Sequence, residues 1–472
     1  TVENRKLIGK MIDEEWMVPN EYFEQYYPDV CVEQEIPEFS DTLRIGCFLV
    51  VQKMFRDLQI EDVLSSIFGD LGPFIEDIVS YMIANESCTF QYYSNFMRNH
   101  PVMDKNIRDD TQISRLLKYN IKEEDINLFL RAWNQMNNTK ECIYVGYDST
   151  NFNTNAYGIE LADYGHPKVD EGLPQYNLAY AVNQKDSTPL FYELYDGSVI
   201  DNTELEIMLE EAKEFGHERL GVLMDRGYIS EKNIKALRSK GYEYILMMKQ
   251  NQKICQEIIE EYGAAVQSLE GYYIGEHGVY GTTVKKQLYG QETNIHVYYD
   301  DIRASEEKVA LMSRYETWEK EIEKKVEKKL ATEGEMKKYR KVFKLKYDQN
   351  GYLVAYQRNS RYIKEEIRNL GFFFIITSED MSASKALDIY RGRDNIEKMF
   401  RSLKSGIDFY KARVHTTESL KSKVFVTFIA MIIRNELFQK AEVLRKKNRK
   451  AYTVPGMISE LENIECTRNS VG

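Results

Sequence analysis

Residues 143–148, Ile-Tyr-Val-Gly-Tyr-Asp, alternate along the chain and are rich in residues that favour β-strands. The sequence after them predicts strands at Leu178–Val182 and Leu190–Tyr195, a helix at Asn202–Phe215, a strand at Leu220–Met224, a helix at Glu231–Ser239 and a strand at Tyr244–Met248. Three strands followed by helix, strand, helix and strand is the order of an α/β layer around one sheet.

This pattern stops near residue 250 and resumes with a predicted strand at Phe372–Thr377. In between, the glycine-punctuated alternation of Tyr272–Tyr299 predicts a small antiparallel sheet, and the densely charged Glu306–Lys346 predicts a solvated helical arm. We therefore expect a domain at residues 251–370, inserted between two parts of one fold at residues 141–250 and 371–440.

The two ends of the chain differ from this core. Residues 1–140 are predicted to be mostly helical, with apolar residues at helical spacing in Ile60–Phe68, Phe74–Ile83 and Glu123–Met136. Such a region could be a separate binding module or a helical bundle packed on the core, and the sequence favours neither. Residues 441–472 are expected to form a basic tail that begins with the cluster Arg445–Lys450.

Composition excludes several classes of protein. The 472 residues are 43% hydrophobic and 29% charged, which is typical of a soluble globular protein, and the longest nearly apolar run, Val424–Ile433, is about half of a membrane span. Thr1–Lys10 has no secretory signal, and the six cysteines contain no C-x-x-C pair, which indicates a reducing cytoplasm. Without paired His or Cys ligands, any metal should be held by carboxylates, as magnesium or manganese is.

Charge is distributed unevenly. The formal net charge of −12 argues against a nucleic-acid partner. However, residues 385–450 contain 17 Lys and Arg against 7 Asp and Glu. A basic segment of this kind on an acidic body can still bind phosphate.

A helix predicted to start near Ser384 carries polar groups at regular spacing. At about 100° per residue, Tyr390, Arg393, Glu397 and Lys404 share an arc of about 60°. A separate apolar stripe should pack on the sheet, formed by Ile389, Ile396, Phe400, Leu403 and Ile407. Gly406 could end the helix. Taken alone, this pattern also fits an ordinary amphipathic helix with a solvated face.

The spacing Tyr390-x2-Arg393-x3-Glu397-x6-Lys404 resembles the Tyr-Arg-Glu-Lys signature of bacterial insertion-sequence transposases of the DDE type. Two further segments resemble the same family. Tyr147-Asp148-Ser149-Thr150 ends the first predicted strand, and Asp225-Arg226-Gly227-Tyr228 ends the fourth. An Asp at the end of a strand is also common as a turn or helix cap.

The resemblance implies an α/β fold whose catalytic core is RNase H-like, as in retroviral integrases, interrupted by an insertion domain and preceded by a helical N-terminal region. It implies that Asp148, Asp225 and Glu397 are the catalytic residues and hold two Mg²⁺ ions, for which Mn²⁺ can substitute. Asp148 is then the ligand shared by both ions.

The implied activity is cleavage of transposon ends by water, followed by attack of the freed 3′-OH on target DNA. Arg393 and Lys404 should hold phosphates and Tyr390 should hydrogen-bond nearby, while Arg226 is a further candidate DNA contact. Trp318 either stacks on a displaced base or packs the charged arm.

The partners implied are the transposon terminal repeats and target DNA, with a dimer in the DNA complex, no membrane, and a bacterial cytoplasm as location. The helical N-terminal region becomes a candidate for binding the DNA ends. Two alternatives stay open: an RNase H-like nuclease without strand transfer, and a domesticated regulator that only binds DNA.

Overall fold

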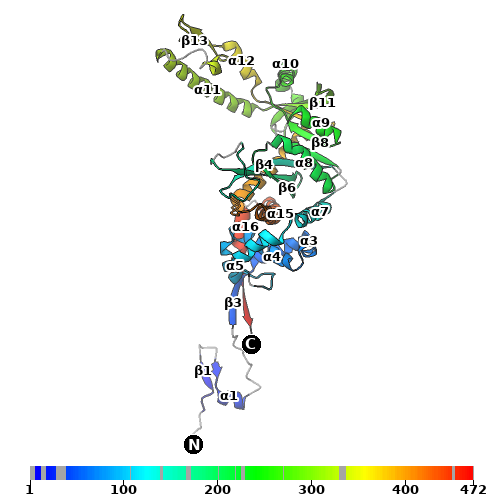
Figure 1. The fold of residues 1–472 in the computed structure, drawn as a ribbon, viewed down its shortest axis with the longest axis vertical. Coiled ribbons are helices and arrows are strands. Elements are labelled where there is room, and N and C mark those ends of the chain that lie inside the picture. Colours follow the sequence, from blue (N-terminus) through cyan, green and yellow to red (C-terminus); the bar gives the residue numbers. More distant parts are fainter. Residues whose placement is uncertain are drawn as a thin grey trace.

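The computed structural model describes residues 6–11, 17–27, 39–106, 108–138, 142–165, 172–199, 201–217, 219–224, 229–268, 270–328, 336–448 and 452–470. Figure 1 shows them along one long axis: an arm at one end, a β-sheet with its helices in the middle, and a layer of helices beyond it.

The described part of the chain is built on a nine-stranded mixed sheet. Its strands, in spatial order, are β6 (Pro189–Asp196), β5 (Gln175–Asn183), β4 (Ile143–Asn153), β7 (Leu220–Met224), β8 (Glu243–Met247), β14 (Phe372–Thr377), β11 (Gln291–Tyr299), β10 (Val279–Leu288) and β9 (Tyr273–Ile274). The neighbours β4, β7 and β8 run parallel, and every other pair is antiparallel. The strands predicted from the sequence are confirmed, in the predicted order along the chain.

Helices cover both faces of this sheet, so β7 and β14 are buried along their whole length. On one face, α13 (Ala383–Arg391) packs on β8, β14, β11 and β10, and α14 (Asp394–Arg401) packs on β4 and β5. On the other face, α9 (Glu231–Ser239) and α10 (Lys253–Ser268) contact the sheet, and α8 (Asp201–Glu214) packs beside α9.

The segment Tyr272–Tyr299 does not form the separate small sheet that we expected. Its strand β11 pairs with β14 from Tyr299–Phe372 to Asn294–Thr377, so β9, β10 and β11 extend the central sheet. The reason lies in β14, whose apolar residues would otherwise be left at an exposed sheet edge. Local alternation predicts a strand but does not identify its partner.

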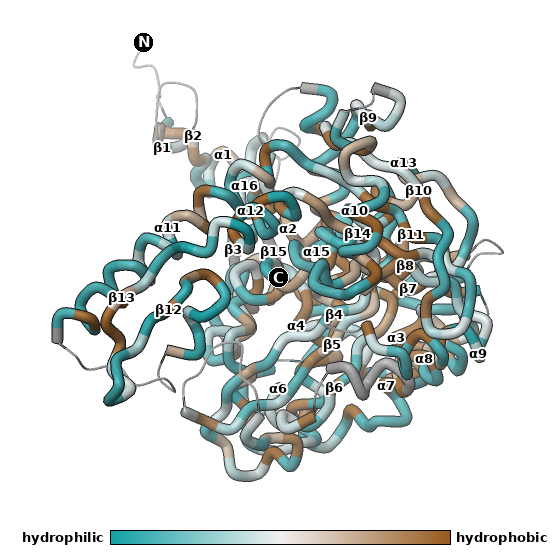
Figure 2. The backbone as a smooth tube through the Cα atoms, turned by 90° about the horizontal axis from the view of Figure 1, so that it is seen from above, coloured by the Kyte–Doolittle hydropathy of each residue, from teal (hydrophilic) through white to brown (hydrophobic). Residues whose placement is uncertain are grey.

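The arm has an apolar core of its own. It contains α11 (Asp301–Lys328), β12 (Phe343–Tyr347), β13 (Leu353–Arg358) and α12 (Ser360–Asn369), around buried residues such as Tyr315, Ile322 and Phe343. Figure 2 shows mostly hydrophilic residues along α11, with apolar positions interspersed. The predicted charged helix is therefore confirmed as α11, and one of its faces is buried. The end of the predicted range is wrong, because Phe343–Lys346 lie in strand β12.

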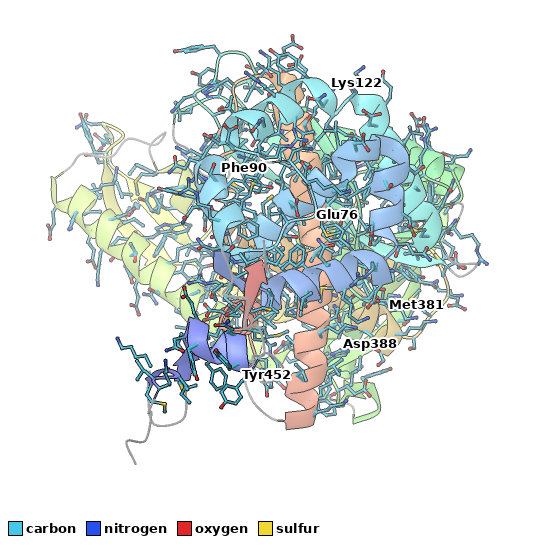
Figure 3. All side chains as sticks on the ribbon, turned by 90° about the horizontal axis from the view of Figure 1, so that it is seen from below. Glu76, Phe90, Lys122, Met381, Asp388 and Tyr452 are labelled. Atoms are coloured by element: carbon cyan, nitrogen blue, oxygen red, sulfur yellow. The ribbon has the colours of Figure 1, made fainter. Side chains whose placement is uncertain are left out.

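The N-terminal region forms a helical layer against the core. Its helices are α2 (Gly46–Asp57), α3 (Ile60–Phe68), α4 (Gly72–Ala84), α5 (Tyr93–Asn99), α6 (Asp110–Arg115) and α7 (Glu123–Asn137). The short helix α1 (Glu21–Tyr26) lies apart from this layer (Figure 1). The three helices predicted from the sequence are confirmed as α3, α4 and α7. Glu76 and Phe90 lie in this layer (Figure 3). The long helix α15 (Thr417–Asn448) packs on α2, α4 and α7 and also on β6, which joins the layer to the sheet.

Short strands accompany the helices at the two ends of the chain, where residues 1–140 were expected to be mostly helical and no strand was predicted. β1 (Gly9–Met11) pairs with β2 (Met17–Pro19), and β3 (Phe39–Arg44) pairs with β15 (Glu465–Ser470). The expected C-terminal tail therefore contains regular structure, with α16 (Val454–Leu461) ahead of β15. Among the described residues, no helix has the length and apolar character needed to cross a bilayer.

Candidate active site

Asp148 lies on β4 where the parallel pairing with β7 ends. The ladder between these strands runs from Ile143–Leu220 to Gly146–Leu223. The strand itself continues to Asn153 because β5 pairs with it on the other side, so the expectation that Asp148 ends the strand is wrong. The Asp148 side chain is half-buried, and its Oδ1 accepts a hydrogen bond from the Ser149 amide at 2.9 Å.

Gly146, Asp148 and Thr150 point to the same face of the sheet because strand side chains alternate. At Gly146, a Cβ atom would lie 3.8 Å from the Cβ of Ile396 on α14. At Thr150, the hydroxyl Oγ1 accepts a hydrogen bond from Lys404 Nζ at 2.7 Å. Asp148 is therefore flanked on both sides by contacts with one helical segment.

The lengths of the two segments agree with this arrangement. Four residues of strand from Gly146 to Thr150 span about 13 Å, and eight residues of helix from Ile396 to Lys404 span about 12 Å. The helical segment therefore runs alongside β4 on the face of Asp148. Glu397, the residue after Ile396, belongs to this same segment and is half-exposed.

The prediction of one continuous helix through Tyr390 and Lys404 is wrong. α13 ends at Arg391, α14 begins directly after Arg393, and a π-helical turn, η7 (Ser402–Gly406), follows α14. A glycine at position 392 favours a break because it costs about 1 kcal/mol in a helix interior. A constant 100° per residue therefore does not hold from Tyr390 to Lys404, and the common arc of about 60° stays a prediction. The predicted end at Gly406 is confirmed.

The four signature residues consequently have different surroundings. Tyr390 is only 6% exposed and packs in the apolar cluster between α13 and the sheet. The Arg393 guanidinium lies 5.9 Å from the centre of the Tyr390 ring, and its Nη2 donates a hydrogen bond to Glu397 Oε1 at 2.7 Å. Arg393 thus holds the Glu397 carboxylate at the start of α14.

Lys404 rests on an aromatic residue that the sequence reasoning missed. Its Nζ lies 5.2 Å from the centre of the Phe152 ring, which itself packs on Tyr176 and Phe409. Phe152 follows Thr150 by two residues and so shares its face of β4. Extending this alternation beyond the motif Tyr147–Thr150 would have identified Phe152 from the sequence.

Asp225 and Arg226 lie outside the described residues, and β7 is described up to Met224. No group of three His, Cys, Asp or Glu side chains able to hold a metal occurs within the described ranges. The expected set of three lies partly outside these ranges, because Asp225 is one of its members.

Trp318 lies on α11, inside the arm. Its ring is partly buried and makes an edge contact with Tyr339 at a centroid distance of 5.6 Å, with the Arg314 guanidinium 5.5 Å from it. Trp318 thus contributes to the arm's own core, and stacking on a DNA base stays a prediction.

Three comparisons with known proteins bear on this arrangement. The model of the family described as "Transposase DDE domain" matches residues 145–433, which is more than half of the chain. The search of curated proteins gave no match. Among solved structures, one described as a cryo-EM structure of the piggyBac transposase synaptic complex with hairpin DNA aligns over 83% of this chain and 70% of that chain, with 9% sequence identity. Its TM-score of 0.38 is too low to support an argument about this chain.

The family match spans β4 with Asp148, the arm, and the α14–η7 segment with Glu397 and Lys404. The chain belongs to the transposase DDE domain family, and it is a DNA transposase.

Proposed function

We propose that Asp148, Asp225 and Glu397 are the catalytic carboxylates of this transposase, and that it cuts the ends of a mobile element and joins the freed 3′-OH to target DNA. The observation that supports this most directly is the course of α14 and η7 along β4, with contacts on both sides of Asp148. Residues 397 and 148, distant in sequence, thereby belong to one region of the fold.

The position of Asp225 in the sequence supports its inclusion. Gly146 and Leu223 are parallel neighbours, and Asp148 and Asp225 each come two residues after them. Arg226, the next residue, is proposed as a DNA contact beside this carboxylate.

The proposed core is RNase H-like. The strand order β6-β5-β4-β7-β8 supports this proposal. In it, three antiparallel strands are followed by two parallel strands, which α9 connects. We propose that the inserted part within residues 251–370 is centred on the arm, from Asp301 to Asn369, because the arm has an apolar core separate from that of the sheet.

The residues present suit a pair of hard divalent cations. Asp148 and Glu397 offer carboxylate oxygens, which Mg²⁺ and Mn²⁺ prefer, and no sulfur or imidazole ligand is part of the proposed set. Asp148 would be shared by both ions, with Asp225 and Glu397 each holding one. When bound, such a pair of ions stabilises charge on the attacking and leaving oxygens of a phosphodiester.

The surrounding side chains position the DNA and the carboxylates. Arg393 provides a planar fork for a phosphate and keeps Glu397 at the site, whereas Lys404 contributes a point charge fixed by Thr150. Tyr390 is buried, so we assign it the role of supporting Arg393 through its ring. A stacking role for Trp318 stays part of the proposal.

The proposed DNA partners are the terminal repeats of the element and a target duplex, bound by a dimer that brings two ends together. The helical layer of residues 39–138 is proposed to contribute to end binding. We further propose that the protein comes from a bacterial insertion sequence and acts in the cytoplasm.

The test is a reaction of the full chain with a duplex that carries the element's own end, in the presence of Mg²⁺. We expect release of a 3′-OH end and its joining to a second duplex, and EDTA should abolish both. Glu397→Gln should lose cleavage by at least three orders of magnitude while retaining DNA affinity, because one ligand charge disappears without a change of shape.

The matched control is Asp394→Asn, which removes an exposed carboxylate from the first turn of the same helix α14. It should cleave at nearly the wild-type rate. Cleavage by Glu397→Gln at the wild-type rate would overturn the assignment, and cleavage by the wild type without joining would identify a nuclease instead.

A further inference from the structure

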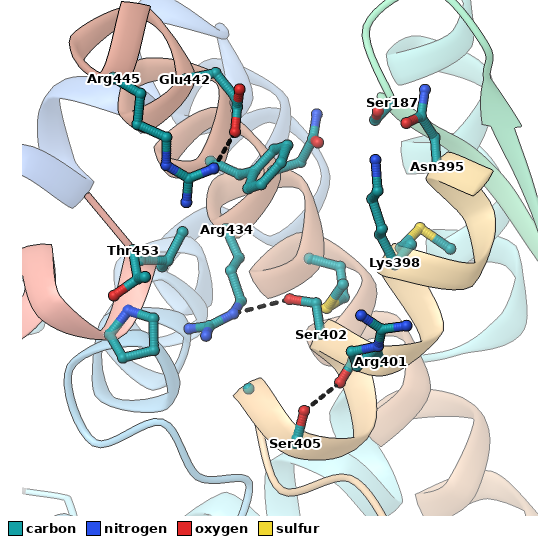
Figure 4. Close-up of a pocket in the computed structure, with 17 residues that line it drawn as sticks. Ser187, Asn395, Lys398, Arg401, Ser402, Ser405, Arg434, Glu442, Arg445 and Thr453 are labelled. Atoms are coloured by element: carbon teal, nitrogen blue, oxygen red, sulfur yellow. Dashed lines mark hydrogen bonds and ion pairs between the residues drawn. The ribbon is translucent and has the colours of Figure 1, made fainter. Parts of the chain in front are cut away.

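A pocket of about 550 Å³ lies next to α14, on the side where α15 and α16 approach it. Its wall combines apolar residues, such as Met399, Met431 and Phe438, with polar ones. Figure 4 shows Lys398 and Arg401 projecting from α14, and Arg434 and Arg445 from α15, around this space.

The charge of the pocket is strongly positive. Four cations line it, and the one acidic residue in its lining, Glu442, is already paired with Arg445. Lys398 and Arg401 are exposed, and neither forms an ion pair within the described part of the chain. Arg434 is paired with Glu86, which lies outside the lining, so two positive charges, those of Lys398 and Arg401, are left without a carboxylate partner among the described residues.

Arg434 is the most informative of these residues because it is only 5% exposed. Its Nη2 donates to Glu86 Oε1 at 2.6 Å and its Nε donates to Ser402 Oγ at 2.9 Å. Its third nitrogen, Nη1, is buried and has no hydrogen-bond partner among the residues that the structure describes. A buried donor without a partner is costly, so this guanidinium is prepared for an acceptor that enters the pocket.

We propose that this pocket binds a backbone phosphate of the DNA, next to the catalytic carboxylates. The planar guanidinium of Arg401, the ammonium of Lys398 and the remaining nitrogen of Arg434 match the oxygens of a phosphate better than those of a neutral ligand. The Ser402 hydroxyl lies in the same wall and can donate to a ligand because it accepts from Arg434 Nε, whereas the Ser405 hydroxyl already donates to the Arg401 carbonyl. The inference rests on the proposed function, since it assumes that DNA is held at Glu397.

The spacing along α14 favours a phosphate of DNA over a free anion. Lys398 directly follows Glu397 in the sequence. Arg401 lies one turn of helix beyond Glu397, about 6 Å further along the axis. Consecutive nucleotides of one strand advance about 3.4 Å, so a strand held at Glu397 brings its next phosphates to the mouth of the pocket. A phosphate bound there would link α14 to α15 through Arg434.

The first test compares charge removal inside and outside the pocket. The full chain, in EDTA so that no cleavage occurs, is titrated with end duplex at several salt concentrations. Lys398→Gln and Arg401→Gln should each weaken binding and reduce the slope of log K against log salt by about one. Lys385→Gln, an exposed residue of α13 that is not part of the pocket, is the matched control and should leave the slope unchanged.

The second test uses inorganic phosphate as the probe. At constant ionic strength, phosphate should raise the Tm of the wild type more than that of the Lys398→Gln, Arg401→Gln double variant. If phosphate stabilises the wild type but both pocket variants keep the salt slope of the control, the pocket takes a free anion and the proposal is overturned. Identical behaviour of pocket variants and control in both assays also overturns it.

These outcomes are distinct from a failure of the proposed function. If the wild type cleaves end DNA in Mg²⁺ and the pocket variants bind DNA like the control, the phosphate-binding role of the pocket is wrong. The catalytic assignment then still stands. If the wild type neither binds nor cleaves end DNA, the proposed function and the proposed phosphate site are both wrong.

Discussion

Lys404 Nζ donates a hydrogen bond to Thr150 Oγ1 at 2.7 Å, although the two residues are 254 positions apart in the chain. This contact fixes η7 against β4, two residues beyond Asp148. The lysine of the signature is therefore positioned by the same strand that carries the first carboxylate.

Thr150→Val should impair catalysis more than DNA affinity. Thr150 is buried, and valine keeps its shape while removing the acceptor for Lys404. A lost hydrogen bond to a charged group is worth about 1.5–3 kcal/mol, so we expect the cleavage rate to fall about tenfold or more. Single-turnover cleavage measures this effect. Thr150→Ser keeps the hydroxyl and should retain most activity, and equal rates for both variants would contradict the positioning role.

Gly406→Ala should displace the Arg434 guanidinium. A Cβ atom at residue 406 would lie 2.5 Å from Arg434 Nε and 2.7 Å from its Cζ, closer than atoms can approach. The hydrogen bonds of Arg434 to Ser402 and Glu86 should be lost, and the free energy of unfolding should drop by about 2–4 kcal/mol in urea denaturation.

The control for this variant is Gly271→Ala, because a Cβ at residue 271 meets no atom within 4 Å. Its free energy of unfolding should change by less than about 0.5 kcal/mol. Similar values for the two variants would show that the close approach of Arg434 to Gly406 is not a constraint.

Glu76→Gln should change how stability depends on pH. Burial raises the pKa of Glu76 from its ordinary value of 4.5 to about 7, and Glu61 and Asp77 add to the effect. The folded state therefore prefers the protonated carboxyl. The free energy of unfolding should fall as pH rises from about 4.5 to 7, by at most about 3 kcal/mol from this group.

Urea denaturation at pH 5 and pH 8 measures the change. Glu76→Gln should be more stable than the wild type at pH 8 and lose that advantage at low pH. Asp62→Asn, an exposed residue of the neighbouring helix α3, should follow the wild type. A constant offset between Glu76→Gln and wild type across this range would refute the expectation.

Lys423→Met should show the opposite pH window. Lys423 is 2% exposed and packs on the Phe90 ring, and its burial lowers its pKa from 10.5 to about 8. Below pH 8 the folded state holds a buried charge, and this penalty is relieved as pH rises from about 8 to 10.5. The stability advantage of Lys423→Met, about 1–3 kcal/mol at pH 7, should therefore shrink over that range.

Thermal unfolding at pH 7 and pH 10 checks this prediction. Lys421→Gln, on the same helix but ion-paired with Glu123, should show no such gain at pH 7. A lower Tm for Lys423→Met at pH 7 would mean that the contact with Phe90 outweighs the cost of burying the charge.

Much of the core could be predicted because its signals are local. The strand-forming residues of β4 and β5, the strand β7 and the helix α9 depend on neighbouring residues only, and all of these elements are found in the structure. The spacing of Arg393, Glu397 and Lys404 likewise identified the segment that lies along β4.

The continuity of the catalytic helix and the partner of β11 could not be predicted in this way. Whether the helix breaks at Gly392 and widens at η7 depends on contacts with the sheet and with Arg434. The pairing of β11 with β14 joins segments more than seventy residues apart, and the alternation in each strand fits many partners.

The sequence by itself determined most strands and helices of the central sheet and which acidic and basic residues form the signature, because side-chain periodicity and residue spacing are properties of the chain. Only the tertiary structure decided that Lys404 reaches Thr150, that Arg393 holds Glu397 at a helix start, and that Arg434 faces a cationic pocket with an unused donor. These contacts arise from packing between distant segments, where the burial of apolar surface and the pairing of buried polar groups select one arrangement among many that local periodicity allows.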